Sequence, residues 1–485
     1  MSVWSAANSR IVVNLAALLA GRGFTLAVNL VWLVATVRLF APAEVALLAF
    51  SSLAATWLDA LRGLGMSTWL VRHLPGLWRA DRAAAARFIR SYLYCSFVPL
   101  AVCSLATWGG ALAGRPDLVA PGGEATPWSY ALLGVALQSV SATFLVILQC
   151  FGEMGKLAAW NAWFSVSQRL APVAAAAWYG WGLNEFLIVS ALLSLASLAP
   201  SAGVVHGWLS HGRGVARWGE FWPDSRHYYS SALLRFGATQ LDQVLVAMFF
   251  RAEMLVTYYV LRRFYSLAVV FVSSCVDAVA PLLAARAAAQ PESALRLLAE
   301  MRALILLAGT LTAALTAANG AALLRAVLGG AYAAEPGLVA LFALAALAYG
   351  LYSVSLTGEA LLGSAARSTR WVVVALAANL ASVPVLAAAF GVHALPMSLV
   401  VGFVAGSLAA SWGSDLPLGL GGRLWLRFAV VAVCGLAPTL ALGGGWPWLP
   451  RLAFGNGLVL AWLAWERYTG GLQPVRVWFA ARRAA

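Results

Sequence analysis

Charged residues are scarce in this chain of 485 residues. Only 10% of the residues are Asp, Glu, Lys or Arg, while 62% are hydrophobic. An ordinary soluble domain has about 25% charged residues. No polar stretch is long enough to form a separate soluble domain, so we expect one membrane-embedded unit.

Motifs for catalysis, metal binding and cofactor binding are also missing. The five cysteines (Cys95, Cys103, Cys150, Cys275 and Cys434) are odd in number and show no CxxC spacing, and the five histidines do not cluster. The chain contains no Walker A sequence and no HExxH sequence, and no large outside loop carries paired acids. These absences argue against a disulfide framework, a metal site, a built-in ATPase and an enzyme, and we expect no cofactor.

Long apolar stretches are what the sequence has instead. A helix needs roughly 20 apolar residues to cross ~30 Å of hydrocarbon, and about 14 stretches of that length follow one another. We place them at 11–37, 43–65, 89–112, 127–149, 157–180, 185–207, 229–250, 253–284, 302–327, 337–362, 371–390, 394–414, 425–444 and 448–467. The 22 Trp and 13 Tyr suit two interfacial belts. The predicted fold class is an all-α polytopic membrane protein with about 14 transmembrane helices.

The net charge of +14 predicts an orientation. In a soluble protein such a surplus would suggest nucleic acid, but here the Arg residues gather in loops on one side of the membrane. The other side receives only Arg38, Arg115, Arg251, Arg325 and Arg451. By the positive-inside rule, both termini are expected in the cytoplasm, and no nucleic-acid partner is expected.

A weak internal repeat predicts two lobes. An Ala-Glu pair opens both the second span, at Glu44, and the eighth, at Glu253, and a proline follows near the inside end in each case, at Pro75 and Pro281. Parallel repeats of this kind build transporters with a site between the halves. The predicted domains are a six-helix lobe at 1–210, a second six-helix lobe at 211–415 related by a pseudo-twofold axis, and two additional helices with a tail at 416–485.

Several spans carry charged side chains near their middles, where charges are costly and usually line a path or a pocket. The clearest are Arg22, Arg169, Asp242 and the pair Arg262 and Arg263. A guanidinium group matches the oxygens of a phosphate or a carboxylate, so a cavity lined by these Arg residues suits an anionic head group such as a diphosphate. Some in-span charges have a simpler explanation, because Arg62 could neutralise Asp59 and lies near the inside boundary.

Short sequences in both halves carry a resemblance to a known family. They are 37–50, 61–66 and 71–75 in the first half, and 241–246 and 256–264 in the second. The chain resembles the oligosaccharide and polysaccharide flippases of the multidrug/oligosaccharidyl-lipid/polysaccharide exporter superfamily. Members show an acidic residue in the seventh span, where Asp242 stands, whereas Ala46 and Thr257 replace glycines of the family pattern.

The resemblance implies a transporter that moves undecaprenyl-diphosphate-linked oligosaccharides across a bacterial inner membrane by alternating access of two six-helix lobes. Fourteen spans also resemble the lipid II flippases of the superfamily, whose last two helices border a lipid-tail groove. Multidrug antiporters of the superfamily usually have twelve. Membrane lipids and polysaccharide-assembly proteins are the other partners considered.

The predicted site lies in a cavity between spans 1–6 and 7–12. The substrate-binding residues are expected to be Arg22, Arg62, Asn161, Gln168, Arg169, Tyr259, Arg262, Arg263 and Tyr352. Among them the arginines would bind the diphosphate, and the amides and tyrosines would contact sugars. Asp242 and Glu359 are expected to carry a coupling proton or ion. Three alternatives stay open: a cation-coupled drug exporter, a lipid-linked glycan polymerase or ligase, and a non-catalytic component of a polysaccharide export complex.

Overall fold

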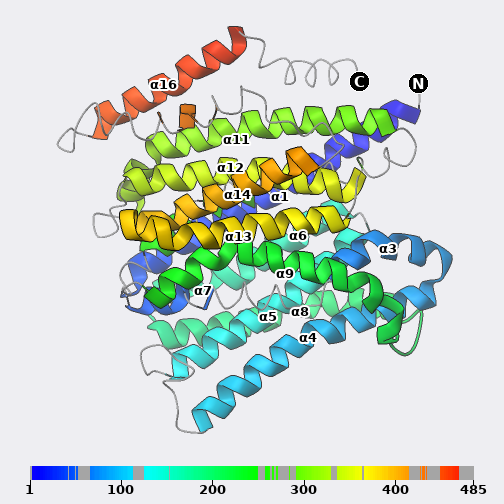
Figure 1. Cartoon of the computed structure of the whole chain (residues 1–485). Coiled ribbons are helices and arrows are strands. Elements are labelled where there is room, and N and C mark those ends of the chain that lie inside the picture. Colours follow the sequence, from blue (N-terminus) through cyan, green and yellow to red (C-terminus); the bar gives the residue numbers. More distant parts are fainter. Residues whose placement is uncertain are drawn as a thin grey trace. The chain divides into compact units, whose positions relative to one another are not determined.

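The computed structural model is built of helices. It describes residues 3–41, 43–49, 51–52, 66–112, 125–151, 153–249, 257–262, 265–266, 269–270, 283, 291–328, 336–362, 365–413, 427, 429–431, 433 and 448–468, and no strand occurs among them. Figure 1 shows the long helices that make up the chain. The predicted fold class, an all-α polytopic membrane protein, is confirmed.

The described helices that correspond to predicted spans end within two residues of the predicted span ends, whereas several of them begin earlier than predicted. The first part of the chain forms α1 (Val3–Leu39), α3 (Met66–Ala80), α4 (Arg82–Leu112), α5 (Ala125–Cys150), α6 (Met154–Ser165), the π-helix η3 (Val166–Leu170), α7 (Ala171–Tyr179), α8 (Leu183–Leu209) and α9 (Trp218–Phe249). The second part forms α11 (Pro291–Leu328), α12 (Pro336–Leu362), α13 (Ala365–Phe390), the 3₁₀ turn η5 (Gly391–His393), α14 (Ala394–Gly413) and α16 (Trp448–Tyr468). The second, eighth and thirteenth predicted spans are described only in part.

Five stretches of the described chain are long and apolar enough to cross a membrane. They are Tyr130–Cys150, Leu183–Leu209, Glu292–Ala326, Pro336–Ala360 and Ala366–Gly413, the last of which contains both α13 and α14. Gly23–Leu39 in α1 is a shorter apolar helix. The chain is therefore a multi-pass membrane protein.

Several helical stretches were expected as loops or parts of loops. The helix α3 occupies the Arg-bearing loop predicted after the second span. The helix α9 begins at Trp218, well before the predicted start at 229, and α11 begins at Pro291, well before the predicted start at 302. For the early start of α9 the sequence carries a signal, which is Glu220. Its carboxylate accepts the backbone N–H of Arg217 at 3.1 Å. That bond is one half of a capping box, which fixes where a helix begins.

The chain divides into two compact units. One contains 1–19, 237–242 and 257–485, and the other contains 20–236 and 243–256. We call them the C-unit and the N-unit. The predicted three-part domain division stays a prediction, as does the cavity expected between two lobes.

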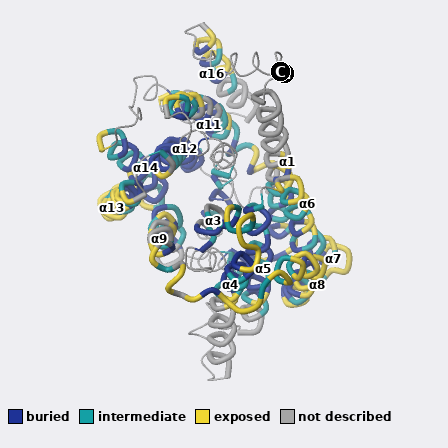
Figure 2. Tube along the Cα trace, turned by 90° about the vertical axis from the view of Figure 1, so that its right-hand side faces the viewer, coloured by how far each residue is buried: buried dark blue, intermediate teal, exposed yellow. Residues whose placement is uncertain are grey.

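In the C-unit, α12 packs against both α11 and α14, and α13 packs against α14. Figure 2 shows α12 largely dark blue, hence buried, and α13 largely yellow. The exposed side chains of α13 are mostly apolar, such as Val374, Leu380 and Val385. An exposed apolar surface on a membrane helix is expected to face lipid. The last helix, α16, packs against α11, with Val431 and Val459 in a shared core.

In the N-unit, α3 packs against the start of α4 and the end of α5. Met66, Leu70 and Leu74 of α3 are fully buried against Ile89 and Ile147. The amphipathic pattern of α3 explains this packing, because residues at three- and four-residue steps share one face.

The connection between α8 and α9 is fastened to α4. Arg90 donates to the backbone carbonyls of Leu209 at 3.1 Å and Gly212 at 2.8 Å, and also to that of Gly214. Ser91 accepts the N–H of Ala216 at 2.8 Å. The guanidinium of Arg90 therefore satisfies carbonyls at the end of α8, where no further helical turn can do so.

Candidate functional site

A buried cluster of charged and aromatic side chains joins α9 to the helical residues 257–262 and 265–266 of the C-unit. The Nε atom of Arg262 lies 2.9 Å from Oδ2 of Asp242, and its Nη2 atom donates to Oδ1 at 3.4 Å. Both residues are only 2% exposed. The hydroxyl of Tyr258 donates to Oδ2 of Asp242 at 2.7 Å. The two opposite charges are thus paired and hydrogen-bonded, which is the condition for keeping them in the interior.

Arg262 has two further contacts within this cluster. Its Nη2 atom donates to the backbone carbonyl of Thr239, one turn before Asp242. Its guanidinium carbon lies 4.1 Å from the ring centroid of Tyr265, which is a cation–π contact. We call the five residues Thr239, Asp242, Tyr258, Arg262 and Tyr265 the Arg262 cluster.

Helical spacing explains how the two segments present these groups. Tyr258, Arg262 and Tyr265 follow one another at four- and three-residue steps, so they lie on one helix face. Thr239 and Asp242 are separated by three residues and share a face of α9. The same region of α9 is held to α13, because the amide of Asn379 donates to the carbonyl of Ala238 at 3.3 Å.

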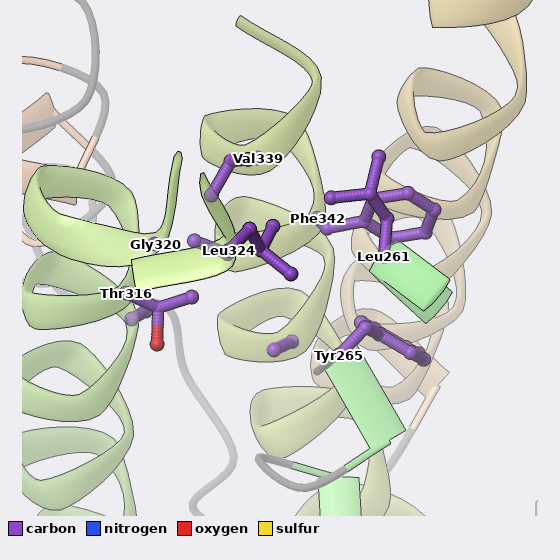
Figure 3. A pocket seen from close by; sticks show the side chains of 10 residues that line it. Leu261, Tyr265, Thr316, Gly320, Leu324, Val339 and Phe342 are labelled. Atoms are coloured by element: carbon purple, nitrogen blue, oxygen red, sulfur yellow. The ribbon is translucent and has the colours of Figure 1, made fainter. Parts of the chain in front are cut away.

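A narrow apolar pocket adjoins the cluster at Tyr265. Leu261 and Tyr265 line it together with residues of α11 and α12, and Figure 3 shows Thr316, Gly320, Leu324, Val339 and Phe342 around it. Gly320 permits the close approach of α11 and α12, since a Cβ atom there would lie 2.7 Å from Cγ1 of Val339. The Arg262 cluster therefore borders mostly apolar side chains at Tyr265.

Two more buried carboxylates in the C-unit have arginine partners. Glu359, near the end of α12, is fully buried and lies 3.0 Å from Nε of Arg367. Glu466 of α16 is also fully buried and lies 3.3 Å from Nε of Arg427. Among the described residues, Asp242, Glu359 and Glu466 are the buried acids, so each is neutralised by a guanidinium group.

The buried polar side chains described in the N-unit are neutral, and those around Gln168 bond between helices. Gln168 is buried, and its Nε2 donates to the hydroxyls of Ser141 at 3.3 Å and Ser197 at 3.0 Å. One turn away, the hydroxyl of Ser165 donates to that of Thr25 at 3.2 Å. These bonds join helices α1, α5 and α8 to the fifth predicted span.

The fifth predicted span changes its helical winding at this network. Residues Val166–Leu170 form a π-helix, and α7 then begins with Pro172 in its first turn. Gln168 and Arg169 are both in the π-helix, and Arg169 is half-buried. Isolated π-helical turns are frequent at functional sites. Asn161 lies in α6 and is half-buried.

The remaining predicted site residues are placed as follows. Tyr259 is buried in the segment 257–262, and Tyr352 of α12 is buried against Phe403 of α14, with ring centroids 5.4 Å apart. Arg22 belongs to α1, but its side chain lies outside the described part, as do residues Arg62 and Arg263. The structure thus brings Arg262 together with Asp242, whereas Gln168 joins a separate network in the N-unit.

Sequence reasoning missed Tyr258 and Tyr265 as members of the site. The signal was present in their helical spacing from Arg262, which would have placed both on its face. It also treated Asp242 and Arg262 as groups with separate roles, because no pattern in the sequence links residue 242 to residue 262.

Sequence comparison finds no relative, since no protein-family model matches the chain and no curated protein matches it. Comparison with solved structures is informative. The chain is similar to the lipid II flippase MurJ in an inward closed conformation, with 11% identity and a TM-score of 0.66, covering 93% of this chain and 99% of that one. The fold is that of a MurJ- and MATE-type transporter.

The MATE neighbours match over similar lengths. The MATE multidrug transporter DinF-BH, solved as a complex, has 16% identity and a TM-score of 0.63, covering 85% of this chain and 97% of that one. The Vibrio cholerae MATE transporter VcmN, in its bent form, has 14% identity and a TM-score of 0.60, covering 88% and 99%. All three neighbours are transporters or flippases, and at these identities the likeness establishes the fold.

Proposed function

We propose that this protein is a flippase that moves a lipid-diphosphate-linked oligosaccharide across the bacterial inner membrane by alternating access. The proposed cargo is anionic at its diphosphate and polar at its sugars. The proposed orientation has both termini in the cytoplasm, following the distribution of Arg residues among the loops. The likeness to a lipid II flippase is compatible with this class of cargo.

The observation that carries the proposal is the charge balance of the buried side chains. Each buried carboxylate of the described residues has an arginine partner. Arg302 of α11 is buried as well, and Arg169 is half-buried in the π-helix. The described interior therefore carries no excess of negative charge. Guanidinium groups in such surroundings favour the binding of phosphate oxygens.

A cation-coupled drug exporter is the alternative favoured by the MATE neighbours, one of which is a multidrug transporter. Such a protein needs a carboxylate that can take up a cation during the transport cycle. Asp242 is the acid of the seventh span, but it is occupied by Arg262 and Tyr258. This pairing favours an anionic cargo over a cationic one.

The proposal is tested by complementation of a bacterium that lacks its own oligosaccharide flippase. Replacement Arg169→Ala is expected to abolish surface glycan while lipid-linked oligosaccharide accumulates in the cell, because the proposed diphosphate contact is lost. Lys156→Ala, on the preceding helix α6, is the control, since Lys156 is exposed and pairs only with the neighbouring Glu153 among the described contacts. The amounts of both variants in the membrane are measured alongside.

Normal surface glycan with Arg169→Ala would contradict the proposed role of Arg169. Failure of the unmodified protein to restore glycan, combined with increased resistance to toxic organic cations, would favour the drug exporter instead. In that case Asp242→Asn should abolish the resistance, because the acid would be needed to bind the cation.

A further inference from the structure

The Arg262 cluster has the composition of a cation-binding site. The guanidinium is surrounded by both carboxylate oxygens of Asp242 and the backbone carbonyl oxygen of Thr239. The hydroxyl oxygen of Tyr258 lies 2.7 Å from Oδ2 of Asp242. Oxygen ligands of this kind, with a single negative charge among them, are the ligands that hard cations prefer.

We propose that Arg262 is a built-in cation that occupies a monovalent-cation site formed by Asp242, the Thr239 carbonyl and the Tyr258 hydroxyl. The guanidinium supplies the positive charge that a bound sodium ion would otherwise supply. Because it is attached to the chain, it remains at the site at any salt concentration. The protein therefore requires no sodium for the stability of this region, and an external cation reaches Asp242 only after Arg262 has left it.

Two features separate this cluster from an ordinary structural ion pair. The first is the backbone carbonyl of Thr239, which contributes a neutral oxygen beside the carboxylate. The second is the face of Tyr265 below the guanidinium, which also favours a positive charge. The pair Arg427 and Glu466 is also buried, but a contact between Nε and Oε1 is the only one described between its side chains. That pair is the natural comparison for an experiment.

The inference does not depend on the proposed cargo, and its test needs no transport assay. The variant Arg262→Ala is purified in detergent, and its thermal unfolding is compared in sodium chloride and in choline chloride at equal ionic strength. Sodium should raise the unfolding midpoint of this variant by about 3 °C or more, because a ligand that binds the folded state stabilises it. The unmodified protein should unfold at the same temperature in both salts.

Three further variants complete the test. Arg262→Lys keeps a tethered positive charge and should show no response to sodium. Arg427→Ala leaves Glu466 without its partner and should also show none, because no hydroxyl or backbone carbonyl of the described residues bonds to this pair. Asp242→Asn combined with Arg262→Ala removes both charges and should abolish the sodium response.

Equal unfolding of Arg262→Ala in the two salts would overturn the proposal, and so would an equal sodium response of Arg427→Ala. If Arg262→Ala cannot be purified, the double variant Asp242→Asn with Arg262→Ala tests the proposal instead. It should fold without sodium, because removal of both partners leaves no buried charge. Failure of the double variant to fold would mean that Arg262 stabilises this region by packing, and the proposal would be rejected.

Discussion

The C-unit and the N-unit keep polar groups in their interiors by different means. In the described part of the C-unit, buried carboxylates meet arginines, as in Asp242 with Arg262 and Glu466 with Arg427. In the described part of the N-unit, the buried polar side chains are neutral, as in Gln168 with Ser141 and Ser197. The prominent arginine contact of the N-unit is Arg90, which is partly exposed and binds carbonyls of the connection between α8 and α9.

The difference has an energetic meaning. A buried ion pair contributes little net stability, but loss of one partner leaves an uncompensated charge. A neutral hydrogen bond is lost at a smaller cost. The C-unit should therefore be far more sensitive than the N-unit to single substitutions of interior polar residues, and the following predictions test this from the largest effect to the smallest.

The largest effect is expected for Glu466→Ala in the C-unit. It leaves the buried guanidinium of Arg427 without its partner, and we expect a destabilisation of about 3–5 kcal/mol. The measurement is SDS-induced unfolding of the protein in detergent micelles. The double variant Arg427→Met with Glu466→Met removes both charges and should be much closer to the unmodified protein. Equal destabilisation by the single and double variants would disprove the role of charge.

A smaller effect is expected for Arg90→Ala in the N-unit. The variant loses the bonds from a charged donor to the carbonyls of Leu209, Gly212 and Gly214, and we expect a destabilisation of about 2 kcal/mol, since the donor is partly exposed to solvent. Limited trypsin digestion should cut faster after Arg213, which lies in the released connection. Arg79→Ala on α3 is the control. Unchanged digestion would show that Arg90 does not hold the connection.

A still smaller destabilisation is expected for Gln168→Met in the N-unit. The side-chain volume is nearly kept, but the hydroxyls of Ser141 and Ser197 lose a neutral donor, and we expect a cost of about 1 kcal/mol. The same unfolding assay measures it, with Ser167→Ala in the same π-helix as the control, since the Ser167 hydroxyl donates to the backbone carbonyl of Trp163 one turn earlier. A cost equal to that of Glu466→Ala would break the contrast between the two units.

The smallest effect is expected for Lys156→Ala. The ion pair of Lys156 with Glu153 is 2.9 Å long but lies at the surface. Exposed pairs contribute about 0–0.5 kcal/mol, and this contribution is screened by salt. The variant should unfold like the unmodified protein at both low and high salt. A loss of stability as large as that of Gln168→Met would show that Lys156 makes a stabilising contact other than the one with Glu153.

Much of the fold could be predicted from the sequence, because the length of an apolar stretch is a local property. The spans expected at 127–149 and 337–362 correspond to α5 and α12 with only small shifts at their ends. A local signal also explains the Ala-Glu pair that opens the second span, since the carboxylate of Glu44 accepts the N–H of Ala41 at 2.8 Å. The helix α3 was missed because its arginines suggested a loop.

The partners of the charged residues could not be predicted. Helical spacing shows which side chains share a face, but it does not show which other helix that face meets. Arg427 and Glu466 are separated by 39 positions, and only the tertiary structure brings their side chains together. The same holds for Arg90 and the carbonyls more than a hundred residues further along the chain.

The sequence by itself determined that this chain crosses a membrane many times as helices, because that outcome depends on the number of consecutive apolar residues. It also determined which helix positions carry charge. Only the tertiary structure decided that Asp242 is neutralised by Arg262, because the energy of a buried charge depends on the atoms within a few ångströms of it, and these come from another segment of the chain.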